Sequence, residues 1–157
     1  MSVVWILVIL ACIFALYMAW TIGANDVANA MAPAVGSGVL TLRNAVIIAA
    51  VAEFLGAVLV GNSVTSTIRK GIVSPSLFLN DPSIFMLGMT SALLGAALWL
   101  HTATLFGMPV STTHSIVGAV IGFGLIAKGF GSLDYWTLSK IVMSWFVSPV
   151  FGGFLGF

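Results

Sequence analysis

The stretch GANDVANAMAPAVGSG, from Gly23 to Gly38, directly follows a run of some twenty apolar residues at the N-terminus. It places three polar side chains, Asn25, Asp26 and Asn29, at the end of a hydrophobic segment, and the residues after them are again mostly apolar. Polar groups with membrane-like sequence on both sides are costly and usually functional. We therefore expect this stretch to shape both the fold and a site.

The composition identifies the class of protein. Of the 157 residues, 61% are hydrophobic and only 6% are charged, whereas a soluble domain carries about a quarter charged residues. So few charges cannot cover a water-exposed surface, so we expect an all-α integral membrane protein. The net charge of +1 provides no basic footprint for nucleic acid. The single cysteine, Cys12, has no partner for a disulfide within the chain.

Long apolar segments predict the membrane spans, because a helix needs about 20 apolar residues to cross a bilayer. Spans are expected at residues 2–22, 44–60 and 135–157, within a single transmembrane repeat unit covering 1–157. The first segment is longer than the roughly 7–15 residues of a signal-peptide core, so we interpret it as a retained span. We expect a multi-pass protein of the inner or plasma membrane, with a loop and one interfacial turn over residues 61–83.

Two further apolar segments, together residues 84–127, meet at FGMPVSTTH, Phe106 to His114, with almost no polar connector. Pro109 suits the first turn of a helix, and the residue before a proline is disfavoured in one. The turn carries three hydroxyls and a histidine but no formal charge, which suits a pocket better than an open loop. We therefore expect a re-entrant helical hairpin, whose turn lies at membrane depth within a cavity. The alternative is two complete spans joined by an exposed turn.

The spacing of the first polar group favours one helix face. Asn25 and Asn29 are four residues apart and Asp26 and Asn29 are three apart, so all three can share a face. The following glycines and Pro33 predict a broken first helix, the arrangement with which transporters build ion sites near the membrane midplane. The alternative is an ordinary helix cap at the membrane surface.

Glu53 is a second candidate, because it lies near the centre of the predicted span 44–60. An ionised carboxylate there costs several kcal/mol or more unless it has a partner. No basic residue lies within one helical turn of it. We expect it to be protonated, bound to a cation or facing a polar cavity, and the alternative is a buried neutral acid that donates one hydrogen bond.

Ser111, Thr112 and Thr113 form a third candidate group at the predicted start of a helix. Free N–H groups at a helix N-terminus, with adjacent hydroxyls, make a ready site for an anion. Ordinary helix capping is the alternative. His114 is a secondary candidate, more typical of a packing residue than of a metal ligand, because no cysteine or second close histidine completes a metal-binding pattern.

Charge balance connects these groups. An anion held at the helix start would be repelled by Asp26 and Glu53 unless a cation or a proton binds with it, which predicts coupled anion symport and no organic cofactor. Asparagine and aspartate oxygens are hard ligands, so a Na⁺ site is expected at Asn25 and Asp26. A rival is an intramembrane serine hydrolase built on Ser111, His114 and Asp26, but no nucleophile-elbow pattern surrounds the serine. A membrane scaffold without transport is a third alternative.

Two long motifs, GANDVANA at residues 23–30 and GMPVSTTHSIVGAVIG at 107–122, resemble the signatures of the PiT family of inorganic phosphate transporters, as does VAEFLGAVLVG at 51–61. The resemblance implies symport of phosphate with Na⁺ or H⁺, and a fold of two inverted repeats that each contain a re-entrant hairpin. It also implies roles for the candidate residues. By motif match, the broken first helix would be lined by Asn25, Asp26 and Asn29, the hairpin tip by Ser111, Thr112 and Thr113, and the acidic transport position would be Glu53.

Members of that family carry both signatures twice, whereas this chain carries each once. The chain therefore resembles the N-terminal half of a carrier, either a fragment or a separately encoded half. The expected partners are phosphate, a coupling cation, membrane lipid and a second half, with homo-oligomers left open and no nucleic acid. Sulfate carriers resemble this family, but phosphate can offer a proton to Asp26 or Glu53 and sulfate cannot, which favours phosphate.

Overall fold

The computed structural model describes residues 3–156, without the side chains of residues 69 and 70, and these residues are almost entirely helical. Four helical segments are long and apolar enough to cross a membrane, namely α1, α2 as far as Ile68, α3 and α5. The expectation of a multi-pass, all-α membrane protein is therefore confirmed. In chain order the elements are α1 (Val3–Gly36), α2 (Leu42–Gly71), the 3₁₀ turn η1 (Pro75–Phe78), α3 (Pro82–Leu105), α4 (Thr112–Lys128), the 3₁₀ turn η2 (Phe130–Ser132) and α5 (Tyr135–Gly156).

The predicted break in the first helix is wrong, because α1 runs without interruption through the polar stretch and reaches Gly36 instead of ending near residue 22. Alanines between the polar residues favour the helix, and Pro33 falls in the last turn, where losing one backbone donor matters least. The helix stops where Gly38 takes a positive φ of 77° and Leu40 N–H donates to the carbonyl of Ala34. At about 1.5 Å per residue, α1 is about 51 Å long.

The second helix is also longer than the predicted span 44–60, because α2 continues to Gly71. The hydroxyls of Ser66 and Thr67 both donate to the carbonyl of Ser63 within the helix, so polar residues that suggested a loop are satisfied in helical form. The loop predicted over 61–83 is consequently short. Its interfacial turn corresponds to η1.

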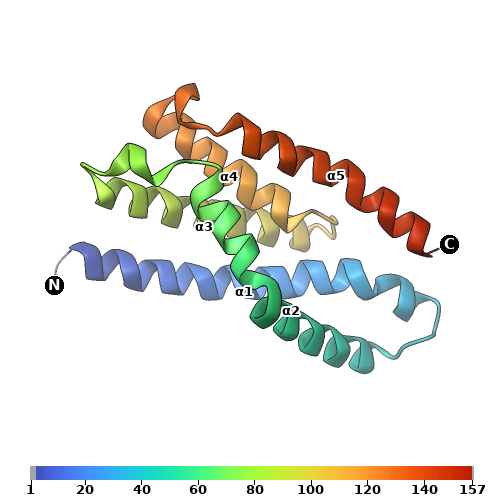
Figure 1. Ribbon diagram of the computed structural model, residues 1–157. Helices are drawn as coiled ribbons and strands as arrows, with labels where there is room; N and C mark the ends of the chain where they lie inside the picture. The colour runs from blue at the N-terminus through green and yellow to red at the C-terminus, as the bar shows by residue number, and fades with distance from the viewer. Residues whose placement is uncertain (1–2, 157) are drawn as a thin grey trace.

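The helices cross the molecule in alternating directions (Figure 1). α3 and α4 form an antiparallel hairpin, and the chain enters and leaves it at one end of the molecule, where Asp134 N–H donates to the carbonyl of Ile72 at 3.0 Å. Asp134 also caps α5 by accepting from Thr137 N–H at 2.9 Å, a hydrogen bond that holds the pKa of Asp134 below its ordinary value. The chain termini lie at opposite ends (Figure 1).

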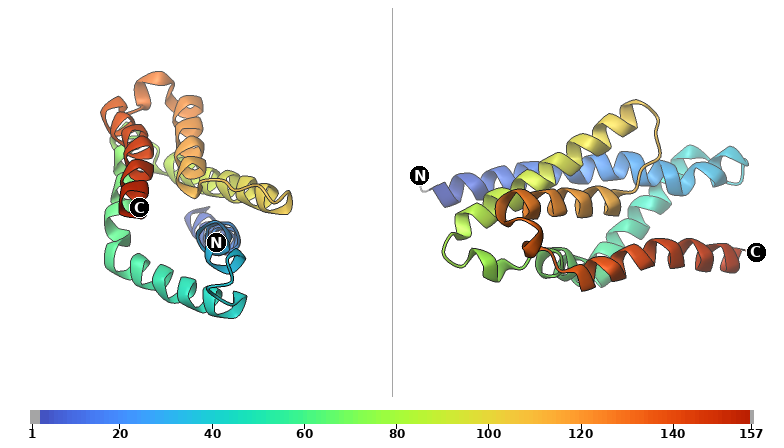
Figure 2. Two further views of the ribbon diagram at one scale, coloured as in Figure 1. Left: turned by 90° about the vertical axis from the view of Figure 1, so that its right-hand side faces the viewer. Right: turned by 90° about the horizontal axis from the view of Figure 1, so that it is seen from above.

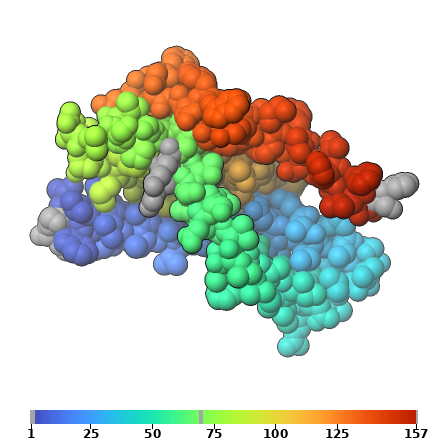
Figure 3. Space-filling view, in the orientation of Figure 1, coloured from blue at the N-terminus to red at the C-terminus, as the bar shows by residue number. Residues whose placement is uncertain are grey.

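Two apolar clusters hold the helices together. One surrounds the hairpin base, where Ile72, Val73 and Phe78 pack with Val117 and Val120 of α4. The other joins α1 to α3 through small side chains, which let the helices approach closely; it contains Met18, Ala96, Ala97 and Leu100. α2 leaves the bundle after its first turns, as the end-on view of Figure 2 and the surface in Figure 3 show.

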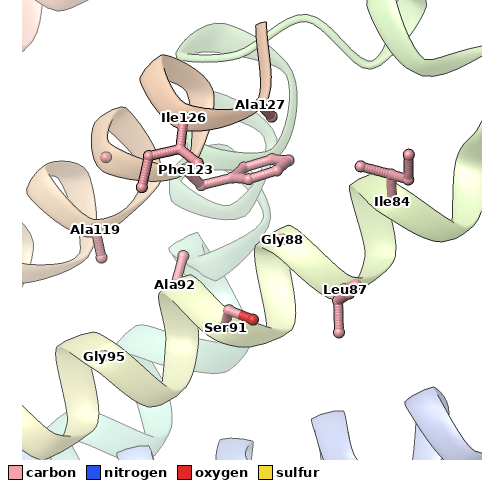
Figure 4. A pocket seen from close by; sticks show the side chains of 11 residues that line it. Ile84, Leu87, Gly88, Ser91, Ala92, Gly95, Ala119, Phe123, Ile126 and Ala127 are labelled. Carbon is pink, nitrogen blue, oxygen red and sulfur yellow. The ribbon is translucent and has the colours of Figure 1, made fainter.

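The base of the hairpin depends on one close approach between α3 and α4. The Phe123 ring of α4 lies over Gly88 of α3 (Figure 4), so near that a Cβ at this position would overlap the ring. Phe123 is itself enclosed by Phe78 and Phe85, whose ring centroids are 5.5 and 6.1 Å away. The ring therefore has little freedom to move aside.

Replacing Gly88 by alanine should destabilise the protein by about 1–3 kcal/mol, the usual cost of overpacking a filled site. Gly95 lies on the same helix with open space around its Cα, so Gly95→Ala is the matched control and should be neutral or slightly stabilising, because alanine favours helices. Thermal unfolding of the purified protein in detergent measures both. Equal melting temperatures for the two variants would contradict the packing argument.

Candidate functional site

The turn between α3 and α4 is attached to α1 through the side chain of Asn25, which is only 4% exposed. Its Nδ2 donates to Thr104 Oγ1 at 3.1 Å and to the carbonyl of Met108 at 3.3 Å. Its Oδ1 accepts from Val110 N–H at 3.4 Å and from Asn29 Nδ2 at 2.8 Å. These bonds use the full capacity of an amide, two donors and two lone pairs. Asn25 therefore fixes the turn against the helix.

Asp26 makes the second link between α1 and the hairpin. The hydroxyl of Thr112 donates to its Oδ1 at 2.7 Å, a short hydrogen bond of the kind typical of charged acceptors. Thr112 is the first residue of α4, so the carboxylate lies beside a helix N-terminus, whose dipole stabilises negative charge. The predicted proximity of the two polar motifs is thus present in the structure.

The start of α4 offers hydrogen-bond donors. Ser111 is the N-cap, and its Oγ accepts from His114 N–H at 3.3 Å, which leaves the hydroxyl hydrogen free to donate. Among the described residues, no hydrogen-bond acceptor is present for the backbone N–H groups of Thr112 and Thr113 or for the Thr113 hydroxyl. Ser111 and Thr113 are both exposed.

Two hollows flank the turn. One, of about 470 Å³, follows the polar side of α1 and contains the side chains of Asn25 and Asn29 together with the Gly107–Pro109 backbone. The other, of about 360 Å³, lies on the α4 side and contains Ser111 and His114. Both faces of the turn are therefore open to small polar solutes.

Glu53 is not part of this constellation. It lies in the middle of α2 and its side chain is exposed, and among the described residues it has no hydrogen-bond or ion-pair partner. The only buried residues of α2 in the described chain are Ala45 and Ala49, near its start, where α2 still packs against α1. The repeat alone therefore does not bring Glu53 to Asp26.

His114 takes part in packing. Its ring stacks on Trp145 of α5, with centroids 3.5 Å apart and planes at 24°. The hydrolase alternative needs Ser111, His114 and Asp26 in one hydrogen-bonded chain, but Ser111 bonds the backbone of His114, and Asp26 bonds Thr112. The arrangement does not support nucleophilic catalysis.

The sequence did not predict the role of Thr104 or of the turn backbone. Thr104 accepts from Asn25 and donates to the carbonyl of Leu100 at 2.7 Å, and the carbonyl of Met108 and the N–H of Val110 complete the contact. A neutral threonine in an apolar helix is ordinary, and backbone groups leave no trace in composition. The one available signal was its position, one helical turn before the GMPVSTTH motif.

Comparison with known proteins identifies the family. The pattern described as the phosphate transporter family matches residues 22–157. A protein from Chlamydia trachomatis named as a phosphate permease is 50% identical over 98% of this chain, and the Inorganic phosphate transporter 2-1, chloroplastic, of Arabidopsis thaliana is 50% identical over 92% of it. A solved structure titled "The sodium-dependent phosphate transporter" is 51% identical over 94% of the chain, with a TM-score of 0.88.

The chain spans only part of these relatives, 36% of the Chlamydia protein, 25% of the Arabidopsis protein and 36% of the solved structure. The resemblance drawn from the two signature motifs is confirmed, and the family is one of transporters rather than enzymes. The fold, the two motifs and the close relatives agree, and the chain belongs to the phosphate transporter family.

Proposed function

We propose that this chain forms one repeat of a membrane carrier that moves inorganic phosphate together with Na⁺. The observation that carries the proposal is the hydrogen bond between Thr112 and Asp26, which places a carboxylate directly beside the donor-rich start of α4. An anion site and an acidic side chain in contact require a cation as the third member.

The anion side consists of donors without formal charge. The hydroxyls of Ser111 and Thr113 and the N–H groups of Thr112 and Thr113 point from one helix start, which is the usual construction of a phosphate site. The Thr112 hydroxyl is directed at Asp26 in this structure. It joins the anion only if the carboxylate is neutralised, so the two binding events are linked through one side chain.

The cation side rests on Asp26 and Asn29. Asn25, the predicted Na⁺ ligand, has both oxygen lone pairs engaged by Asn29 and Val110, so we assign it to holding the turn. The oxygens of Asp26 and Asn29 lie three residues apart on the same helix face, and Na⁺ as a hard cation prefers such ligands. The solved relative at 51% identity is titled sodium-dependent, which favours Na⁺ over a proton.

Electrostatics explain the obligatory coupling. Two like unit charges about 4 Å apart repel by about 4 kcal/mol near a protein surface. Phosphate arriving beside an ionised Asp26 would lose most of the free energy that its hydrogen bonds provide. A Na⁺ ion between them removes this repulsion, and each ion then raises the affinity for the other, as linkage requires.

We also propose that α3 and α4 are a re-entrant hairpin. The turn meets α1 at Asn25 and Asn29, and α1 continues for a further seven residues to Gly36, about 10 Å at helical rise. The turn therefore stops short of the end of α1. Non-helical backbone at such a depth must face protein or a watery cavity, and the hollow beside Gly107–Pro109 provides one.

With the hairpin excluded, α1, α2 and α5 give an odd number of crossings, so a following copy of the repeat would enter the membrane inverted. We propose that such a second repeat completes the site and covers the exposed Glu53 of α2. Glu53 then serves the coupling from the opposite wall of the cavity.

Removing single hydroxyls tests the anion site. In the complete carrier, with both repeats present, Thr113→Val and Thr112→Val should raise the KM for phosphate by about ten- to a hundredfold, the effect of losing a hydrogen bond of roughly 1.5–3 kcal/mol to a charged group. Thr102→Val is the matched control, because Thr102 bonds only within its own helix. Uptake of labelled phosphate measures all three, and an unchanged KM in both site variants contradicts the assignment.

The depth of the turn can be tested by chemical access. A cysteine at position 110 should react with a small hydrophilic thiol reagent, and excess phosphate should slow the reaction. Cys12 is exposed, so the background is a variant in which it is replaced by alanine. Fast reaction with a bulky impermeant reagent, at a rate indifferent to phosphate, would show an ordinary exposed loop.

Neutralising the acids tests the coupling. Asp26→Asn keeps the size of the side chain and removes its charge, and it should abolish phosphate accumulation driven by a Na⁺ gradient while the folded protein persists, because asparagine can still accept from Thr112. Glu53→Gln is expected to reduce accumulation as well. Accumulation at the wild-type level in both variants, measured in vesicles with an imposed Na⁺ gradient, would exclude the coupling role.

A further inference from the structure

We infer that Thr104, which lies outside both signature motifs, is a positioning residue for the anion site and acts through Asn25. The inference rests on the proposed function, since the site it positions is the proposed phosphate site. Its evidence is the hydrogen bond from Asn25 Nδ2 to Thr104 Oγ1 at 3.1 Å, from a donor that also reaches the carbonyl of Met108 at 3.3 Å.

Thr104 is prepared to accept this bond. Its own hydroxyl hydrogen is committed to the carbonyl of Leu100 at 2.7 Å, so the oxygen presents only lone pairs to α1. This orientation selects the Nδ2 side of the Asn25 amide. The Oδ1 of Asn25 is thereby directed at the turn, where it accepts from Val110 N–H at 3.4 Å.

The consequence reaches the start of α4 along a short path. Val110 immediately precedes Ser111, the N-cap, and the donors of Thr112 and Thr113 follow. If Thr104 loses its hydroxyl, the Asn25 amide keeps the acceptor at Met108 but loses the one that fixes its rotation. The Val110 N–H then loses a well-placed acceptor, and the anion donors lose their fixed position relative to Asp26.

The effect of Thr104 is local, because α1 and α3 have other contacts. Two helical turns earlier, the Tyr17 hydroxyl and His101 Nδ1 are hydrogen-bonded at 2.6 Å. Buried small side chains and Leu100 pack between the same helices. Loss of the Thr104 hydroxyl therefore leaves the helix pair assembled and changes only the fit of the turn.

The chain offers two matched controls. Thr102→Val removes a hydroxyl that bonds within α3 at 2.8 Å, to the carbonyl of Leu98, and the Thr102 side chain is exposed. Tyr17→Phe removes an α1–α3 hydrogen bond remote from the turn. The first reports any effect on the helix itself, and the second reports the effect of weakening the helix pair.

In the complete carrier, Thr104→Val should raise the KM for phosphate about three- to tenfold, the effect of one neutral hydrogen bond, with an unchanged maximal rate per folded molecule. Thr104→Ser should restore the wild-type KM. Thr102→Val should match the wild type, and Tyr17→Phe should lower the melting temperature without changing the KM. An unchanged KM in Thr104→Val overturns the inference.

A second measurement is independent of phosphate. With a cysteine at position 110 in the Cys12→Ala background, Thr104→Val should raise the thiol labelling rate severalfold in the absence of substrate, and neither control should do so. If the wild-type carrier took up no phosphate, the proposed function would fail, but equal labelling rates with and without the Thr104 hydroxyl would still overturn the inference, and a raised rate would support it. If Thr104→Val does not accumulate, Thr104→Ala replaces it, and equal labelling rates in Thr104→Ala and Thr104→Ser overturn the inference.

Discussion

The rest of this structure depends on the requirement that a buried carboxamide, Asn25, must have all its hydrogen bonds made within the membrane. No water is available there to replace a missing partner, so an unsatisfied donor or acceptor costs several kcal/mol. The hairpin turn supplies the carbonyl of Met108 and the N–H of Val110, which are themselves unpaired at the end of α3. Each group satisfies the other, and the turn has one stable position against α1.

That mutual satisfaction also explains why α1 is unbroken. A broken helix would release backbone groups for ion binding, but here the side chains already present the polar atoms, and the backbone keeps its own hydrogen bonds. Function is carried by side chains on a rigid helix that faces a turn whose backbone is open. The irregular part of the site lies in the hairpin, between Leu105 and Thr112.

The sequence predicted the membrane class, the hairpin and the meeting of the two motifs, because apolar length, Pro109 and the grouping of polar residues are strong signals. It did not predict the ends of α1 and α2. Glycine, proline and hydroxyl residues suggested breaks, whereas Pro33 falls in a terminal turn and Ser66 and Thr67 bond back to the helix. The partner of Asn25 on α3 was invisible because a lone threonine carries no charge and no pattern.

The division of labour between neighbouring residues follows from the helix geometry. Asn25 and Asp26 are adjacent in sequence but lie about 100° apart around α1, so one is enclosed against α3 while the other reaches the start of α4. The enclosed amide is neutral, which the apolar interface tolerates once its bonds are made. The carboxylate is only half-buried, where a Na⁺ ion can still reach it. The same four residues of α1 thus fix the hairpin on one side and leave a titratable, cation-accessible group on the other, and the charge of that group makes phosphate binding depend on the cation.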